Sequence, residues 1–236
     1  MRRGLAVVVL AAVIGLPGAL ASTAAAAQTC TTSGFWYAPY VGTGITVPSG
    51  ITCDIVGTTV GGAITVQPGG RLHLGDHANI QGGITSTNAG TDTTSDPLGQ
   101  GHFDFSAVIC NSFIGGTVNF TGSASNVVIG DDEGCGGNRI SGAANLKNNT
   151  GGVELIGNAP NDANQPYICP IGKCGISGTV VITGNSGSTH DDSGIAVEVF
   201  YNKIAGSLNC SGNSGITNDS SPAFVSDAKT GQCATF

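Results

Sequence analysis

The densest group of residues capable of chemistry is the acidic stretch Gly130-Asp-Asp-Glu-Gly-Cys135, which is followed four residues later by Arg139. Paired carboxylates supply the acid and the base of glycoside hydrolysis, and clustered carboxylate oxygens also bind calcium. A solvated acidic loop held down by Cys135 explains the same residues without either activity. We assign no catalytic residue here; the binding candidates are Asp131, Asp132, Glu133 and Arg139.

The other polar motifs give weaker signals. His73-Leu-Gly-Asp-His77 crosses a strand-to-turn junction, so an outer-face polar cluster explains it better than a shared metal ion. Thr189-His-Asp-Asp192 is predicted to lie in a loop, without a serine or cysteine nucleophile in a recognisable setting. The sequence contains neither a phosphate loop nor a dinucleotide fingerprint. We therefore assign no metal ligand and no cofactor, with calcium at the acidic stretch as the alternative.

The first 27 residues are typical of a secretory signal peptide. Arg2 and Arg3 form a basic start, an apolar run extends from Leu5 to Leu20, and small residues provide a cleavage site before Gln28. No second apolar run is long enough for a spanning helix. The remaining chain has six basic and fifteen acidic side chains, a net charge of −9, which disfavours nucleic acids and anionic membranes as partners. We expect a secreted protein, either extracellular or associated with the cell wall.

A short phrase recurs along this glycine-rich chain, which has 39 glycines. The phrase is a β-branched residue, one variable residue, a residue that is usually glycine, and then two apolar positions separated by one residue. Its copies are 19, 20, 34, 26, 36 and 28 residues apart, which indicates a constant unit with loops of variable length. The seven copies begin at Val41, Val60, Ile80, Ile114, Ile140, Ile176 and Ile204.

The alternation within each copy is that of a β-strand. Ile64 and Val66 are expected on one side of the strand and Thr65 on the other. Turns such as Gln67-Pro-Gly-Gly70 and Thr183-Gly-Asn-Ser-Gly187 supply the glycine and asparagine that accept left-handed backbone at a sharp corner. Stacked units bury a core that one unit cannot bury alone, so we predict a parallel β-solenoid. A β-sandwich is the alternative, but it would need strands of alternating direction.

Over residues 41–213 the chain resembles a parallel β-helix, and with its N-terminal segment it resembles small secreted, pectin-lyase-like β-helix proteins of actinobacteria. Spacings of 19 residues and more favour the right-handed form. We expect an all-β, single-stranded right-handed parallel β-helix of about seven coils. The expected organisation is a signal peptide over 1–27, an N-terminal aromatic cap over 28–40, and the β-helix with a C-terminal cap over 41–236. Such folds include pectate lyases, polygalacturonases, tailspikes and adhesins, so the fold alone does not select a function.

All eight cysteines follow the N-terminal segment, and an even number in an exported chain indicates disulfides. Residues one coil apart lie about 4.8 Å from each other, within reach of a disulfide. A zinc site would need paired C-x-x-C spacing, which is absent. The pairs separated by about one coil are Cys30 with Cys53, Cys110 with Cys135, and Cys210 with Cys233. Cys169 and Cys174 fit a local loop disulfide.

Four aromatic residues precede the first copy of the phrase, in Phe35-Trp-Tyr-Ala-Pro-Tyr40. Unpaired strand edges at the end of a solenoid need a cover, so we expect an end cap packed on Ile45 and Val47. The alternative is sugar stacking by Trp36 and Tyr37, because aromatic faces suit pyranose rings. Trp36 is therefore a further binding candidate.

Threonine recurs at one outward position of three successive units, at Thr46, Thr65 and Thr85. Some ice-binding solenoids present such a ladder. The next units carry Asn119 and Asn145 instead, and threonine is a common outward residue of strands. We therefore do not favour ice binding.

Two neighbouring units carry long insertions after their second strand, at residues 130–137 and 157–173. We expect both loops to leave the solenoid on the same side, where loops on a rigid scaffold often bind ligands. The additional binding candidates in these loops are Asp162, Tyr167 and Lys173.

These features favour a structural, adhesive or binding role, with a glycan, a cell-surface component or a matrix component as partner. The alternative is a polysaccharide lyase or glycoside hydrolase acting on an acidic polysaccharide. Such an enzyme needs acids together with a general base or a metal in one groove. We favour binding over catalysis, and the sequence specifies neither the ligand nor the oligomeric state.

Overall fold

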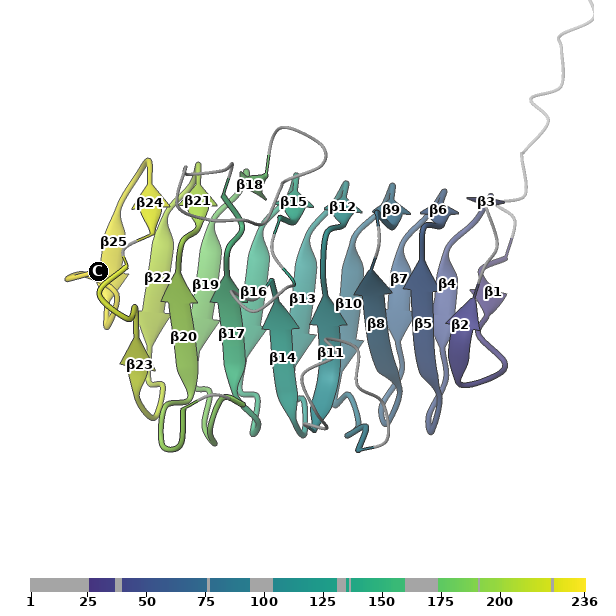
Figure 1. The fold of residues 1–236 in the computed structure, drawn as a ribbon, viewed down its shortest axis with the longest axis horizontal. Helices are drawn as coiled ribbons and strands as arrows, with labels where there is room; N and C mark the ends of the chain where they lie inside the picture. Colours follow the sequence, from purple (N-terminus) through teal and green to yellow (C-terminus); the bar gives the residue numbers. More distant parts are fainter. Residues whose placement is uncertain are drawn as a thin grey trace, which may run out of the picture.

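The protein is a single-stranded parallel β-helix, as the repeated phrase predicted. The computed structural model describes residues 26–36, 40–75, 77–93, 104–130, 135, 137–159, 174–190, 192–221 and 223–236. These residues form 25 strands and no helix. The strands stack along one axis in three sheets, and all pairs of named strands are parallel (Figure 1).

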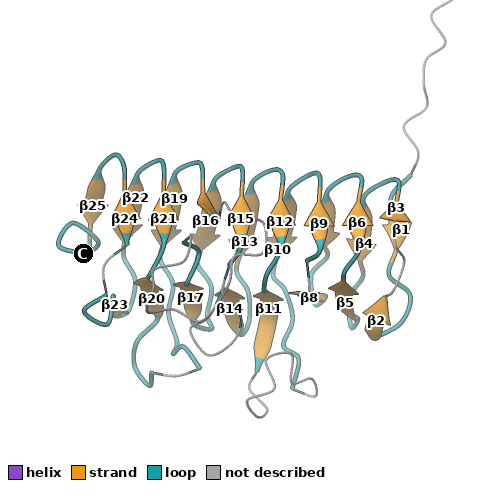
Figure 2. Cartoon of the chain, turned by 45° about the horizontal axis from the view of Figure 1, so that its top comes forward, coloured by secondary structure: helices purple, strands orange, loops and turns teal. Residues whose placement is uncertain are grey.

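We name the three sheets A, B and C. Each turn of the chain contributes one strand to each sheet, in that order (Figure 2). Sheet A contains β1 (Gln28–Thr29), β4 (Ile45–Val47), β7 (Ile64–Val66), β10 (Ile84–Thr87), β13 (Val118–Thr121), β16 (Ala144–Lys147), β19 (Val180–Thr183), β22 (Leu208–Ser211) and β25 (Lys229–Gly231). Sheet B contains β2 (Gly34–Trp36), β5 (Thr52–Val56), β8 (Arg71–Gly75), β11 (Phe105–Ile109), β14 (Asn126–Ile129), β17 (Val153–Ile156), β20 (Val197–Phe200) and β23 (Ile216–Thr217). Sheet C contains β3 (Tyr40–Val41), β6 (Thr59–Val60), β9 (Asn79–Ile80), β12 (Phe113–Ile114), β15 (Arg139–Ile140), β18 (Gly175–Ile176), β21 (Lys203–Ile204) and β24 (Phe224–Val225).

The repeated phrase is the corner at which the chain passes from sheet C to sheet A. Each copy begins at the last residue of a sheet C strand and continues into the next strand of sheet A. Ile64 is fully buried and Thr65 is exposed, which confirms the predicted directions. An eighth copy begins at Val225, but Lys229 stands at its first apolar position, so the pattern did not reveal it.

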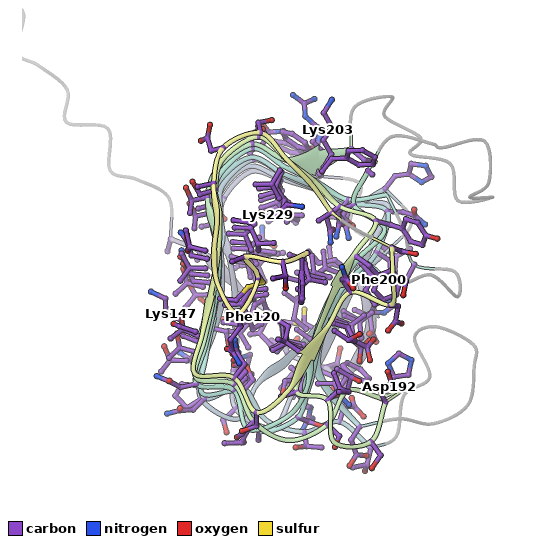
Figure 3. The ribbon with its side chains drawn as sticks, turned by 90° about the vertical axis from the view of Figure 1, so that its left-hand side faces the viewer. Phe120, Lys147, Asp192, Phe200, Lys203 and Lys229 are labelled. Carbon is purple, nitrogen blue, oxygen red and sulfur yellow. A yellow bond between two sulfur atoms is a disulfide. The ribbon has the colours of Figure 1, made fainter. Side chains whose placement is uncertain are left out.

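The core is one continuous column of aliphatic side chains inside the three sheets. Each residue packs on the equivalent residue of the next coil, about 4.8 Å away. Figure 3, which looks along the axis, shows Phe120 inside the solenoid and Lys147 outside sheet A. The repeated residues therefore form the strands of the sheets and also fill the core between them.

Glycine in the phrase is required where consecutive backbones approach each other most closely. A Cβ added to Gly142 would lie 2.5 Å from the carbonyl carbon of Gly116, and one added to Gly206 would lie 2.7 Å from that of Gly178. No side chain fits at such distances, so the third position of the phrase remains glycine in most copies.

The corners between sheets A and B use left-handed backbone, as predicted from their glycine and asparagine residues. Gly69 has a φ of 79° and Asn88 a φ of 55° at equivalent corners, and Gly184 has a φ of 68°. The following residues form a buried file of amides, in which Asn149 donates to the Oδ1 of Asn185 at 2.9 Å. This file replaces water as the hydrogen-bonding partner of the buried corner.

Three predicted disulfides are confirmed. Their Cα atoms are 6.2 Å apart in Cys30–Cys53, 4.6 Å in Cys110–Cys135 and 5.4 Å in Cys210–Cys233. The first and the third connect coils at the two ends, and the second ties the 130–137 insertion to β11. Cys174 is also disulfide-bonded, whereas Cys169 lies outside the described residues.

The N-terminal aromatic segment is part of the solenoid, because β2 pairs with β5 and β3 pairs with β6. The expected cap on Ile45 and Val47 stays a prediction, because residues 37–39 and the side chains of residues 34–36 lie outside the described part of the structure. Tyr40 is 65% exposed. It lies on the outward side of sheet C, because the neighbouring Val41 is the buried member of that short strand.

Candidate functional site

The outward face of sheet C carries one file of residues, one from each strand, and all of them except Gly175 have a side chain. Every member immediately precedes the first residue of a copy of the phrase, and strand register aligns them. Their order along the axis is Tyr40, Thr59, Asn79, Phe113, Arg139, Gly175, Lys203 and Phe224. The file ends on exposed aromatics, since Phe224 is 71% exposed. Figure 3 shows Lys203 projecting outward from this face.

A pocket of about 270 Å³ lies on this file, where β9, β12 and β15 meet the corner from sheet B. Its polar and aromatic lining is formed by His77, Asn79, Gln81, Asn111, Phe113 and Arg139. Three of these residues belong to the outward file, and the others come from the adjoining corners. The repeating coil therefore places residues from three turns around one opening.

The corner side of the pocket is made of residues in left-handed backbone. His77 has a φ of 69° and Asn111 a φ of 44°, in the left-handed region where asparagine, aspartate and histidine are enriched among non-glycine residues. The backbone N–H of His77 donates to the carbonyl of Asn111 at 3.0 Å, so the two corners hold each other in place. Non-glycine residues in this region often occur at functional sites.

The guanidinium of Arg139 lies over the ring of Phe113, with 5.1 Å between its Cζ and the ring centroid. This cation–π contact holds the side chain against the face of sheet C. Among the described residues, no carboxylate forms an ion pair with Arg139 and no acceptor receives its guanidinium N–H groups. None of its five N–H donors is therefore used within the described part of the chain.

The described lining of the pocket contains no carboxylate. Gln81 donates to the Oδ1 of Asn79 at 3.0 Å, which leaves amide groups at the rim for a ligand. Amides, an imidazole, a guanidinium and an aromatic ring match the hydroxyl groups and apolar faces of a sugar.

A second cluster lies on the side of sheet B that points away from the core. Its residues are nevertheless buried. Register aligns a file of outward residues, namely Asp54, His73, Val108, Val128, Glu154 and Glu198. Each is 8% exposed or less. His73 lies on the outward face, as expected for an outer-face polar cluster, but its side chain is buried there. Its Nδ1 lies 3.2 Å from Asp54 Oδ1.

The two glutamates of this file anchor the segment between β19 and β20. The Oε2 of Glu154 lies 2.7 Å from His190 Nδ1, and its Oε1 accepts from the backbone N–H of His190 at 2.9 Å. Thr189 donates to Glu198 at 2.6 Å. Both carboxylates are buried, at 0% and 2% exposure, so in this arrangement they hold the chain's own loop.

The sequence-predicted site residues have different outcomes. Arg139 lines the pocket on sheet C. Trp36 lies in β2, and its side chain is outside the described part of the structure. The predicted gathering of the two insertions stays a prediction, because Asp131, Asp132, Glu133, Asp162, Tyr167 and Lys173 all lie outside the described residues.

Sequence reasoning missed most of the pocket and the buried glutamates. The signal for the pocket was present in the column that precedes the phrase, where Asn79, Phe113 and Arg139 follow one another. The pairing of Glu154 with Glu198 had no comparable signal, because 44 residues and an insertion separate them.

No protein-family model matches the chain, and no curated protein and no solved structure is significantly similar to it. In the described part of the chain, no helix is long and apolar enough to cross a membrane. That part also holds no group of three or more His, Cys, Asp or Glu side chains placed to bind a metal ion. The fold and the pocket thus define a disulfide-linked parallel β-helix with a solvent-facing pocket on sheet C.

Proposed function

We propose that this chain is an exported glycan-binding β-helix, which holds a sugar residue of a surface or matrix glycan in the pocket on sheet C. The observation that carries the proposal is the composition of the pocket, in which Asn79, Asn111 and Arg139 surround a space of about 270 Å³ beside an aromatic ring. This space suits one sugar ring better than a drug-sized ligand.

The rest of the molecule supports a binding role outside the cell. The basic and apolar N-terminal segment is typical of export, and three disulfides are compatible with an oxidising compartment. The resemblance to secreted, pectin-lyase-like β-helices, which rests on the sequence pattern alone, also favours a carbohydrate ligand. The exposed aromatics Tyr40 and Phe224 at the ends of the file offer further apolar contacts to a glycan chain.

The test is a screen of neutral and acidic oligosaccharides on the full secreted chain, followed by titration calorimetry of each binder. Gln81→Trp places a large ring at the exposed rim and should weaken binding at least tenfold, because it fills the pocket. Gln67→Trp makes the same change at an exposed corner of sheet A and should bind normally. If no oligosaccharide binds, or if both variants bind like the wild type, the proposal is wrong.

A second function, hydrolysis of an acidic polysaccharide, has one observation in its favour. Glu154 and Glu198 are adjacent in register on β17 and β20, and one coil of about 4.8 Å is close to the carboxyl separation of retaining glycosidases. Both are buried, so the segment containing His190 would have to move first. Release of reducing ends from polygalacturonate, abolished in Glu198→Gln, would support this function, and no release would exclude that substrate.

A further inference from the structure

We infer that the sugar bound in the sheet C pocket is anionic, and that Arg139 binds its carboxylate, sulfate or phosphate group. This inference rests on the proposed glycan binding and specifies the class of ligand. It concerns the one strongly basic side chain of the pocket.

The two described arginines differ in what their guanidinium groups bind. Arg71 donates to Thr52 Oγ1 at 2.8 Å and to the carbonyl of Gly50 at 2.7 Å, and it lies 3.8 Å from Asp92. It is thus committed to the structure of the corner between sheets A and B. The guanidinium of Arg139 has no hydrogen bond and no ion pair with any described residue.

Arg139 has no carboxylate partner among the described residues, although the chain has fifteen acidic and eight basic side chains. The outward file of sheet C contains no acidic residue in any described strand, so no carboxylate of this file neutralises the charge of Arg139. Its field therefore favours an anionic ligand, whereas the acidic remainder of the protein repels one.

The position of Arg139 also suits recognition of a planar or tetrahedral anion. The cation–π contact with Phe113 holds the guanidinium beside the pocket, and a guanidinium can form paired hydrogen bonds to the oxygens of an anion. Asn111 and His77, which also line the pocket, contribute further donors. These donors would bind the hydroxyl groups of the same sugar whose anionic group binds Arg139.

The experiment compares oligogalacturonate with its fully methyl-esterified form, which has the same rings without the charge. Glucose 6-sulfate and glucose 6-phosphate, titrated separately, distinguish the sources of the anion. Wild-type protein should bind at least one anionic probe at least tenfold more tightly than the neutral ester, and this preference should decrease as salt is raised. Arg139→Gln should remove the preference, and Arg139→Lys should retain part of it.

Lys147→Gln is the matched control, because it removes one exposed positive charge from sheet A and leaves sheet C unchanged. Circular dichroism and thermal unfolding of each variant establish that the β-helix is intact. The wild type could instead bind a neutral glycan with an affinity that Gln81→Trp lowers and Arg139→Gln leaves unchanged. In that case glycan binding stands and this inference is wrong. Equal losses in Arg139→Gln and Lys147→Gln would also overturn it, because they would indicate a general effect of charge.

Discussion

Asn185 shows how a single residue supports this fold. It is fully buried, and its Oδ1 accepts from the backbone N–H and the side chain of Asn149 at 3.0 and 2.9 Å. Its Nδ2 donates to the carbonyl of Leu146 at 3.0 Å and to Asn213 at 2.9 Å. Every hydrogen-bonding group of the amide is therefore used, and no aliphatic residue of similar size can replace it.

Asn185→Leu should lower the free energy of unfolding by roughly 2 to 4 kcal/mol, because several buried groups lose their partners at once. Asn145→Leu is the control, because this half-buried amide bonds on the outer face of sheet A to Asn119. It should cost less than about 1 kcal/mol. Chemical denaturation measures the free energy of unfolding of both variants. Equal losses would show that the buried file of asparagines stabilises the fold no more than the amide pair on the outer face of sheet A.

Core and outward positions of the same coil should also differ. Leu74 is fully buried and Thr65 is exposed. Leu74→Ala should cost about 2 to 4 kcal/mol through lost burial and a cavity, whereas Thr65→Ala should cost less than about 0.5 kcal/mol. Denaturant titration of the two variants gives the comparison, and similar values would contradict the assignment of the two faces.

At the scale of the element, the corner between sheets C and A depends on a stack of glycines. Gly142→Ala should cost about 1 to 3 kcal/mol, because the added methyl group meets the backbone of Gly116 and must displace it. Ser141→Ala, one residue earlier, is the control, since this position is glycine, glutamine, serine or alanine in other copies. Thermal unfolding should separate the two variants; if they melt together, the corner is more compliant than the backbone distances indicate.

The segment between β19 and β20 is a second element-scale device, held to sheet B by buried carboxylates. His190→Ala removes a partner of the buried Glu154, and breaking one side of such a pair is costly. Glu154→Gln and His190→Ala should therefore be less than additive, with a coupling of about 1 to 3 kcal/mol in a double-mutant cycle. Additivity within about 0.5 kcal/mol would mean that the contact does not hold the segment.

At the scale of the whole molecule, each coil contacts only its neighbours, so damage should stay local. Replacing Cys30 and Cys53 by serine opens a loop of 23 residues and should cost about 3 kcal/mol. Hydrogen exchange should increase in β1, β2 and β5, while β16 and β19 keep their protection. A uniform increase along the solenoid would instead show that all the coils unfold as one unit.

The sequence alone determined the solenoid, the inward and outward faces and three of its disulfides. The reason is physical: a β-helix has near-translational symmetry, so a residue and its equivalent in the next copy must stack. Ile64 and Ile84 are paired because both begin the same part of the phrase, and Cys30 reaches Cys53 because one coil separates them. The register continues past the insertions, which leave the coil at its corners, apart from a shift between Phe105 and Ala107 where β11 pairs with β14.

Only the tertiary structure decided what the faces carry. The pocket requires two corners in left-handed backbone, at His77 and Asn111, to meet a file that includes Arg139, and corner shape does not follow from strand alternation. Burial of Glu154 and Glu198 on an outward face also contradicts the simple rule that outward residues of a solenoid are solvated. That burial depends on segments between the strands, whose lengths and paths vary from coil to coil and whose packing the repeat does not encode.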